Sequence, residues 1–304
     1  MHAAIDVGSN TVRMIIGECL HGILRPFEYH RMITRLAGDI SASNELHTAS
    51  MNRTLEALKS FRKILDNANV KNVRMVGTAA LRRASNQREF LDQVFAQTGL
   101  TLDIIAGTEE ARLMTIGVLS VINPIPDNTI IIDIGGGSTE FVCLSEGSVC
   151  FQISYPLGVV KLCEEFTTVH EQQRAITDVI DQFTSALKRH ELNGKNWHLI
   201  GTAGTMTTLA AIDLQLADYD PNLINNHCLH LLKLNETEQH LSSLSNVARE
   251  SITGMEAGRG DLILPGLKLV LELLKTFQQK QIKVADSGLL EGILLDFSQT
   301  KQKY

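Results

Sequence analysis

The sequence contains two versions of one short pattern, and this repeat constrains the fold more than any other feature. IDVGSNTVRMIIGE at residues 5–18 and IDIGGGSTEFVCLSEG at residues 132–147 both read as strand, aspartate, apolar residue, glycine, small polar turn and second strand. Asp6 aligns with Asp133, and Gly8 aligns with Gly135. The copies lie much farther apart than the ~20–50 residues of a solenoid repeat. We therefore expect two related α/β lobes, each of which begins with a β-hairpin.

The hydrophobic pattern supports lobes of this kind. Runs of β-branched and apolar residues predict strands, and apolar residues at intervals of three or four positions predict amphipathic helices. The expected strands are 2–7, 12–18, 22–34, 73–78, 101–107, 129–133, 139–144, 148–155 and 197–201. The expected helices include 48–67, 87–98, 109–121, 169–190, 205–214, 261–278 and 288–297. The pattern restarts after NPIP at residues 123–126, where the second lobe should begin.

Composition indicates a globular protein and excludes several classes. Hydrophobic residues make up 44% and charged residues 20% of the 304 positions, which is ordinary for a folded chain with room for two cores. No apolar run approaches the ~20 residues of a membrane span, and no signal peptide is visible at the N-terminus. Five scattered cysteines without a CxxC pair favour reduced thiols. We expect a cytoplasmic protein with no membrane partner.

The net charge of −6 does not favour a polyanionic partner, so no DNA or RNA partner is expected. A phosphate-rich ligand would have to be held by a local site, and the glycine run at residues 135–137 is a candidate. Glycine lets a ligand approach the main chain closely, and converging amides form an anion nest. A dinucleotide fingerprint fits poorly because the β-rich segment TEFVCL follows the glycines, and the Gly-Lys-Ser/Thr of a Walker loop does not occur. One such hairpin alone would most often be a tight turn with a structural aspartate, whereas two copies favour phosphate binding.

A third glycine-containing segment, GTAGTMTTLAAI at residues 201–212, leads into the helix expected from residue 205. Helix N-termini bind anions through amide groups that have no partner inside the helix. Gly204 and Thr205 are therefore candidate phosphate contacts, although threonine at a helix start is more often a simple cap. Together with the two hairpins, this segment predicts a third wall of a phosphate cleft between the lobes.

Several motifs occur in order along the chain: DVGSNTVRMII, GTAALRRASN, AGTEEARL, DIGGGSTEF, GTAGTMTTLAAI and LPGLKLVLELL. Their order and spacing resemble the exopolyphosphatase/guanosine pentaphosphate phosphatase (Ppx/GppA) family, from about residue 3 to 297. That family belongs to the actin-like ATPase superfamily. The resemblance implies two ribonuclease-H-like lobes, 1–123 plus about 290–304 and 124–289, with the active-site cleft between them. It also implies a homodimer. Leu290 departs from the family pattern, which usually has arginine there.

The resemblance places the catalytic glutamate at Glu110, in AGTEEARLM. Thr108 is the expected N-cap of a helix whose first turn holds Glu109 and Glu110, where acidic residues usually only complement the helix dipole. The implied task of Glu110 is to orient and deprotonate a water that attacks a terminal phosphorus atom. Arg82, in GTAALRRASN, matches a family arginine and is the expected cationic phosphate contact.

A divalent cation, Mg²⁺, is the expected cofactor, because a hard cation bound by Asp6 and Asp133 would offset the charge of a phosphate chain. Asp133 is thereby also a candidate catalytic residue. Glu140 is a candidate additional ligand or water-positioning residue, and the alternative for it is an exposed strand position. The expected main-chain phosphate contacts are Gly8, Ser9, Asn10 and Thr11 in the first hairpin and Gly135, Gly136, Gly137 and Ser138 in the second.

These features predict an enzyme, a Mg²⁺-dependent phosphohydrolase. Its substrate would be inorganic polyphosphate, guanosine pentaphosphate (pppGpp), which it would convert to ppGpp, or both. Another actin-superfamily kinase or ATPase is one alternative, but no adenosine or sugar pocket is recognisable in the sequence. A non-catalytic sensor of polyphosphate or (p)ppGpp is the other, which loss of Glu110 would have favoured; the residue is present.

Overall fold

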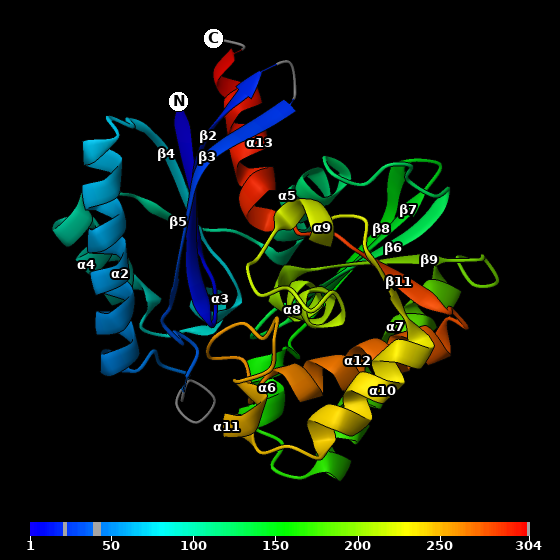
Figure 1. Ribbon diagram of the computed structural model, residues 1–304. Helices are drawn as coiled ribbons and strands as arrows, with labels where there is room; N and C mark the ends of the chain where they lie inside the picture. Colours follow the sequence, from blue (N-terminus) through cyan, green and yellow to red (C-terminus); the bar gives the residue numbers. More distant parts are fainter. Residues whose placement is uncertain (21–22, 39–43, 303–304) are drawn as a thin grey trace. The chain divides into compact units, whose positions relative to one another are not determined.

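The computed structural model describes residues 1–20, 23–38 and 44–302 and divides into two compact units (Figure 1). Unit 1 consists of Met1–Ser120 and Ser287–Tyr304, and unit 2 of Val121–Asp286. Each unit has its own sheet and its own hydrophobic core. Residue 22, expected in the third strand, and residues 303–304, expected in the first lobe, lie outside the described residues.

Unit 1 contains a five-stranded sheet in the order β3-β2-β1-β4-β5. Its strands are β1 (His2–Val7), β2 (Thr11–Leu20), β3 (Ile23–Ile33), β4 (Asn72–Gly77) and β5 (Leu102–Ile104). Its helices are α2 (Thr48–Asn67), α3 (Ala79–Arg83), α4 (Gln87–Thr98), α5 (Gly107–Leu119) and α13 (Leu289–Gln302). The first three strands pair antiparallel, whereas β4 and β5 run parallel to β1. Parallel pairing requires a crossover, which α2 provides before β4 and α3 and α4 provide before β5.

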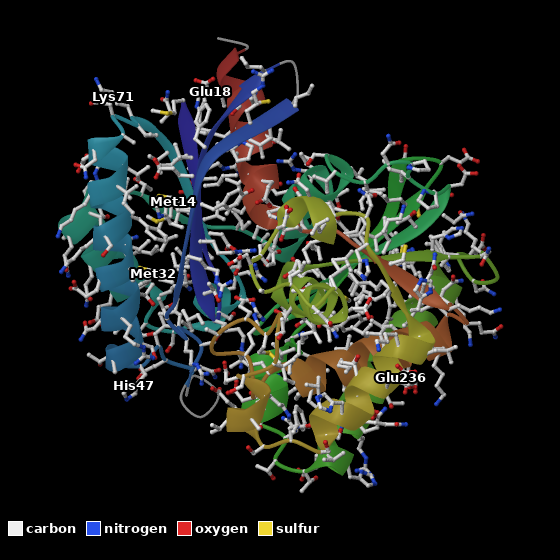
Figure 2. All side chains as sticks on the ribbon, viewed as in Figure 1. Met14, Glu18, Met32, His47, Lys71 and Glu236 are labelled. Carbon is white, nitrogen blue, oxygen red and sulfur yellow. The ribbon has the colours of Figure 1, made fainter. Side chains whose placement is uncertain are left out.

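Strand alternation explains the two faces of the unit 1 sheet. Ile5 and Val7 on β1 belong to the core cluster that also contains apolar residues of α2 and α4, and α13 packs against β1 and β2 (Figure 1). Because neighbouring side chains on a strand point to opposite faces, Asp6 lies on the face opposite to Ile5 and Val7. Met14, labelled in Figure 2, is fully buried on β2, while the side chain of Glu18 near the end of that strand is 41% exposed.

Unit 2 contains a six-stranded sheet in the order β10-β11-β9-β6-β7-β8. Its strands are β6 (Asn128–Ile134), β7 (Thr139–Ser145), β8 (Ser148–Tyr155), β9 (His198–Thr202), β10 (Cys228–His230) and β11 (Gln281–Val284). Its longer helices are α7 (Val169–Arg189), α8 (Ala203–Asp213), α10 (Leu231–Ser242) and α12 (Ile263–Thr276). Its short helices are α6 (Val159–Glu164), α9 (Pro221–Ile224) and α11 (Asn246–Arg249).

The sheet of unit 2 repeats the topology of unit 1. The order β8-β7-β6-β9-β11 corresponds to β3-β2-β1-β4-β5, with the same two antiparallel and two parallel pairings, and β10 adds an antiparallel edge strand. The hairpins are also equivalent in register, since Asp6 pairs with Arg13 and Asp133 pairs with Glu140. The duplicated α/β architecture predicted from the repeat is confirmed.

Candidate functional site

The candidate residues of unit 1 gather where its parallel strands end. In the sheet register, Val7 at the end of β1 lies beside Gly77 of β4, and Gly77 lies beside Ile104 of β5. The first hairpin turn, α3 and α5 follow directly after these three strands. Ligands of α/β sheets characteristically bind at the carboxyl ends of parallel strands.

The first turn presents amide groups rather than carbonyl groups. The amide of Gly8 donates to the carbonyl of Thr11 at 3.1 Å, and amides within residues 34–37 donate to the carbonyls of Ser9 and Asn10 at 2.9–3.0 Å. The amides of Ser9 and Asn10 donate to no acceptor within residues 1–20, 23–38 and 44–302. A turn whose carbonyl groups are already hydrogen-bonded and whose amides are not can bind an anion.

Asp6 is anchored on one side and unsatisfied on the other. Its Oδ2 accepts hydrogen bonds from Arg13 Nε at 3.2 Å and Nη2 at 2.6 Å, and the residue is only 3% exposed. Its Oδ1 is buried and has no hydrogen-bond partner in the described part of the chain. A buried carboxylate oxygen without a donor costs free energy, which a cation or a water at Oδ1 would recover.

Glu110 and Arg82 meet at the same edge of the sheet. Arg82 Nη1 donates to Glu110 Oε2 at 2.5 Å and to the carbonyl of Ile105 at 3.0 Å. Glu110 is 8% exposed, which is rare for a glutamate unless it is paired. The structure therefore brings together the glutamate and the arginine that the sequence singled out separately.

The adjacent Glu109 belongs to a different set of contacts. Its carboxylate accepts from Arg112 at 2.7 and 2.9 Å and from Arg74 at 3.4 Å, and both arginines also donate to Asp296. Hydrogen bonds from Arg112 hold the pKa of Glu109 below its ordinary value. Burial by itself would raise the pKa of Asp296, but hydrogen bonds from Arg112 and Arg74 outweigh burial and lower it. Glu109 is thus engaged in an ion-pair network at the surface of unit 1, which leaves Glu110 as the candidate base.

The start of α5 differs from the prediction. The helix begins at Gly107 with Ala106 as the N-cap, so the expected cap at Thr108 is wrong. Ala106 is extended (φ −66°, ψ 154°), and its carbonyl accepts a hydrogen bond from the Glu110 amide at 2.9 Å. The first turn therefore begins two residues earlier than it would with a cap at Thr108. Glu109 and Glu110 nevertheless both lie in the first turn, as expected.

The second turn, in unit 2, has the same organisation as the first. The Gly135 amide donates to the Ser138 carbonyl at 3.0 Å, and the amides of Val159 and Val160 at the start of α6 donate to the carbonyls of Gly135 and Gly136. The amides of residues 136–138 have no acceptor among the residues that the structure describes. The second turn, like the first, can therefore bind an anion through its amide groups.

This turn also requires close backbone packing. A Cβ at Gly158, which precedes α6, would lie 2.4 Å from the carbonyl of Gly136. Only glycine allows the first turn of α6 to reach the carbonyl groups of the second turn at this distance.

Asp133 and Glu140 are directly opposite each other on β6 and β7. Glu140 is 2% exposed and its Oε1 accepts a hydrogen bond from Ser154 Oγ at 2.7 Å, so the alternative of an exposed strand position is wrong. Opposed like charges in an antiparallel pair are destabilising, and a bound cation would remove this repulsion. The equivalent pair in unit 1 is Asp6 with Arg13, which needs no cation for charge balance.

The third candidate segment lies beside the second hairpin. Thr202 at the end of β9 is the parallel neighbour of Asp133, and α8 begins immediately afterwards at Ala203. The helix therefore starts two residues earlier than predicted, so that Gly204 and Thr205 lie within its first turn. Ala203 adopts the left-handed conformation (φ 67°), which is strained for a residue with a Cβ. Such strain tends to occur at functional sites, and here it directs the strand sharply into the helix.

Arg259 is a residue that the prediction left out of the site. A Cβ at Gly204 would lie 1.7 Å from Arg259 Nη2, so the guanidinium group rests directly on this glycine in the first turn of α8. Glu256 holds the arginine by accepting a hydrogen bond from its Nε, and Glu256 also accepts one from Thr208 at 3.2 Å. The sequence signal for this contact was Gly204, since a glycine at a helix start can indicate that another group packs closely against the main chain. The glycine does not reveal which side chain that is.

Each unit, taken by itself, offers carboxylate groups that suit a magnesium ion whose ligand supplies part of its coordination. The described residues contain no group of three or more His, Cys, Asp or Glu side chains arranged around a metal. Mg²⁺ is usually held by one or two carboxylates together with waters and substrate phosphates. Asp133, beside Glu140, and Oδ1 of Asp6 are carboxylate groups of the required kind.

Comparison with known proteins identifies the family. Residues 17–301 match the Ppx/GppA phosphatase family. The chain belongs to this family. Exopolyphosphatase 2 of Mycobacterium tuberculosis is 30% identical over 97% of this chain and 98% of its own length. The bifunctional 3-dehydroquinate synthase/phosphatase of Fusobacterium nucleatum is 29% identical over 99% of the chain, but the chain spans only 47% of that longer protein.

Solved Ppx/GppA structures agree with the sequence match. The Aquifex aeolicus family member is 29% identical, with a TM-score of 0.81 over 99% of this chain and 98% of that one. An exopolyphosphatase from Cytophaga hutchinsonii is 25% identical, with a TM-score of 0.89 over 98% and 97%. This Ppx/GppA protein therefore has the two-lobed actin-like ATPase fold, as predicted.

Two further features of this Ppx/GppA chain bear on the predictions. Leu290, at the position where the resemblance leads us to expect arginine, is 1% exposed and therefore part of the apolar interior of unit 1. No helix in the described residues is long and apolar enough to span a membrane. The cleft expected between the lobes stays a prediction.

Proposed function

We propose that this Ppx/GppA protein is a Mg²⁺-dependent phosphohydrolase that removes the terminal phosphate from inorganic polyphosphate, from pppGpp, or from both. The pairing of buried Glu110 with Arg82, at the sheet edge that also carries an anion-binding turn, is the observation that carries the proposal. Membership of a phosphatase family and likeness to a protein named exopolyphosphatase 2 support the substrate class.

The proposed reaction needs one base and several anion contacts. Glu110 accepts a proton from a water molecule while the water oxygen forms a bond to the terminal phosphorus. The bond from that phosphorus to the bridging oxygen breaks, and the bridging oxygen leaves on the shortened chain, so the products are orthophosphate and that chain. Phosphoryl transfer requires mainly positioning and charge stabilisation, so a single base is sufficient.

The anion contacts come from groups that the structure presents in each unit. The amides of Ser9 and Asn10, those of residues 136–138, and the first turn of α8, with Gly204 and Thr205, would bind phosphate oxygens. The Gly8 and Gly135 amides close these turns by donating to the Thr11 and Ser138 carbonyls. Arg82 would add a cationic contact, as would Arg259 beside Gly204. Asp6 and Asp133 would hold Mg²⁺, with Glu140 as the neighbouring carboxylate. The ion neutralises charge on phosphate oxygens when bound.

The test is phosphate release from polyphosphate, pppGpp and ATP, each with and without Mg²⁺. We expect release from at least one of the first two, dependent on Mg²⁺, and little release from ATP. Glu110→Gln should lower kcat by a factor on the order of 10²–10⁴, the usual contribution of a general base. Glu109→Gln is the matched control, because it removes the adjacent carboxylate without removing the base.

The outcomes separate the alternatives. Equal activity of the Glu110→Gln variant and the wild type would refute the role of Glu110. Tight binding of polyphosphate or pppGpp without any turnover would instead support the sensor, and release from ATP alone would support an ATPase. The homodimer, the cytoplasmic location and the lack of a nucleic-acid or membrane partner remain our expectations for the same protein.

A further inference from the structure

Arg82 uses only one end of its guanidinium group in the contacts described above. Nη1 donates both to Glu110 Oε2 at 2.5 Å and to the Ile105 carbonyl at 3.0 Å. Nε and Nη2 have no partner in residues 1–20, 23–38 and 44–302, and the side chain is 24% exposed. The arginine therefore still has donors that a ligand can reach.

The remaining donors are the pair best suited to a phosphate. The N–H groups on Nε and Nη2 lie along one edge of the planar guanidinium and point in parallel, which matches two oxygens of one phosphoryl group. Nη1 lies away from that edge. One arginine can therefore contact a phosphate and Glu110 at the same time, without releasing either.

The backbone around Arg82 fixes this arrangement. Arg82 lies on the short helix α3 that follows β4, and its acceptor Ile105 follows β5. The Ile105 amide donates to the carbonyl of Gly77 at 3.1 Å, which ties the ends of these two strands together. The guanidinium group is thus held both by the backbone at the sheet edge and by Glu110. These contacts restrict its movement when substrate binds.

We propose that Arg82 is a positioning residue that couples phosphate binding to the base. In this role, which rests on the proposed function, Nη1 aims the Glu110 carboxylate while Nε and Nη2 hold a phosphoryl group of the substrate. With substrate bound, the arginine would lie between two anions and would offset the repulsion between the Glu110 carboxylate and the phosphate chain. A lysine has one point charge without a rigid fork, so it cannot preserve both contacts in fixed geometry.

The experiment compares Arg82→Lys and Arg82→Ala with the wild type, and uses Arg83→Lys as the matched control from the next position. Steady-state kcat and KM are measured with whichever substrate the wild type hydrolyses, and kcat/KM is followed from pH 5 to pH 9. Thermal unfolding by circular dichroism checks that each variant is folded. We expect Arg82→Lys to lower kcat about 100-fold, the effect of misplacing a reacting group by ~1 Å, with a change in KM of less than about 5-fold.

Two further readouts distinguish positioning from a purely structural role. In Arg82→Ala, the acid limb of the kcat/KM profile should move to higher pH, because the carboxylate has lost a neighbouring positive charge. Guanidinium ion added at millimolar concentration should restore at least about 10-fold of the lost kcat in Arg82→Ala and none in Arg82→Lys.

A change confined to KM in Arg82→Lys, with an unaltered pH profile, would overturn the inference and leave Arg82 as a phosphate contact alone. An equal fall of kcat in Arg82→Lys and Arg83→Lys would overturn the inference as well, since the effect would then not be specific to Arg82. An inactive wild type would instead count against the proposed function itself, so the two failures can be told apart.

Discussion

The contact between α5 and α13 provides a quantitative test of how unit 1 holds the helix that carries Glu110. Gly117 on α5 faces Gly288 and Gly292, and a Cβ at Gly117 would lie only 1.9 Å from the Gly288 carbonyl oxygen. A Cβ at Gly292 would lie 1.8 Å from the Leu113 carbonyl oxygen. Both obstacles are backbone atoms, so they cannot rotate away as a side chain could. Gly117→Ala and Gly292→Ala must each push the two helices apart.

The size of the effect follows from two opposing terms. The 1.9 Å approach falls about 1.1 Å short of the 3.0 Å below which real Cβ atoms essentially never come. Overpacking of a dense contact typically costs about 1–3 kcal/mol and occasionally more, and a forced backbone shift belongs at the upper end. Alanine in a helix interior recovers roughly 0.5–1 kcal/mol relative to glycine. We therefore expect each substitution to lower the free energy of unfolding of unit 1 by about 2 kcal/mol.

The assay is calorimetric or circular-dichroism unfolding of the whole chain, in which the transition of unit 1 should move down by about 4–8 °C for a unit of this size. Gly99→Ala is the control, because a Cβ there meets nothing within 4 Å and only the positive φ of 68° is strained. The double variant Gly117→Ala/Gly292→Ala should lose less than the sum of the two single losses, since one separation of the helices relieves both clashes. Gly117→Ala/Gly99→Ala should be additive.

An unchanged or raised transition temperature in Gly117→Ala would refute the reasoning, because helix propensity alone predicts a gain. Strict additivity of Gly117→Ala and Gly292→Ala would also count against a shared contact.

The other predictions concern backbone strain and pH. Ala203→Gly should raise the free energy of unfolding by about 0.5–1 kcal/mol, because relief of left-handed strain of roughly 1–2 kcal/mol exceeds the added entropy of the unfolded chain; a lower urea midpoint would contradict this. The lowered pKa values of Glu109 and Asp296 imply stability that is present above their ordinary values of about 4 and is lost as the pH falls through the lowered folded-state values. The unfolding temperature of unit 1 should therefore fall between pH 6 and pH 2, and it should fall less steeply in Glu109→Gln/Asp296→Asn. Identical slopes in the variant and the wild type would show that this network does not cause the loss of stability in acid.

The sequence by itself was sufficient for the elements that depend on local pattern. Alternation and β-branched residues predicted the strands of both hairpins, and the equivalence of Asp6 with Asp133 predicted two sheets of one topology. Helical periodicity located α2 and α7. The helix starts were predicted less successfully at α5 and α8. The N-cap of α5 is Ala106, whose side chain cannot signal a cap, and α8 begins at Ala203 directly after β9 without a side-chain hydrogen bond from its N-cap Thr202.

The candidate site was predictable as a set of residues but not as a set of contacts. Sequence motifs selected Glu110 and Arg82, yet only the parallel ordering of β1, β4 and β5 brings them to one edge of a sheet and separates Glu110 from the Arg74–Glu109–Arg112 network. In the same way, the equivalent hairpin positions could be aligned, but the structure decided that Arg13 neutralises Asp6 while Glu140 adds charge beside Asp133. Local pattern is encoded by the periodicity of the backbone, which neighbouring residues determine. Ion-pair partners and close glycine contacts such as Gly204 with Arg259 depend on segments distant in sequence, so only tertiary packing determines them.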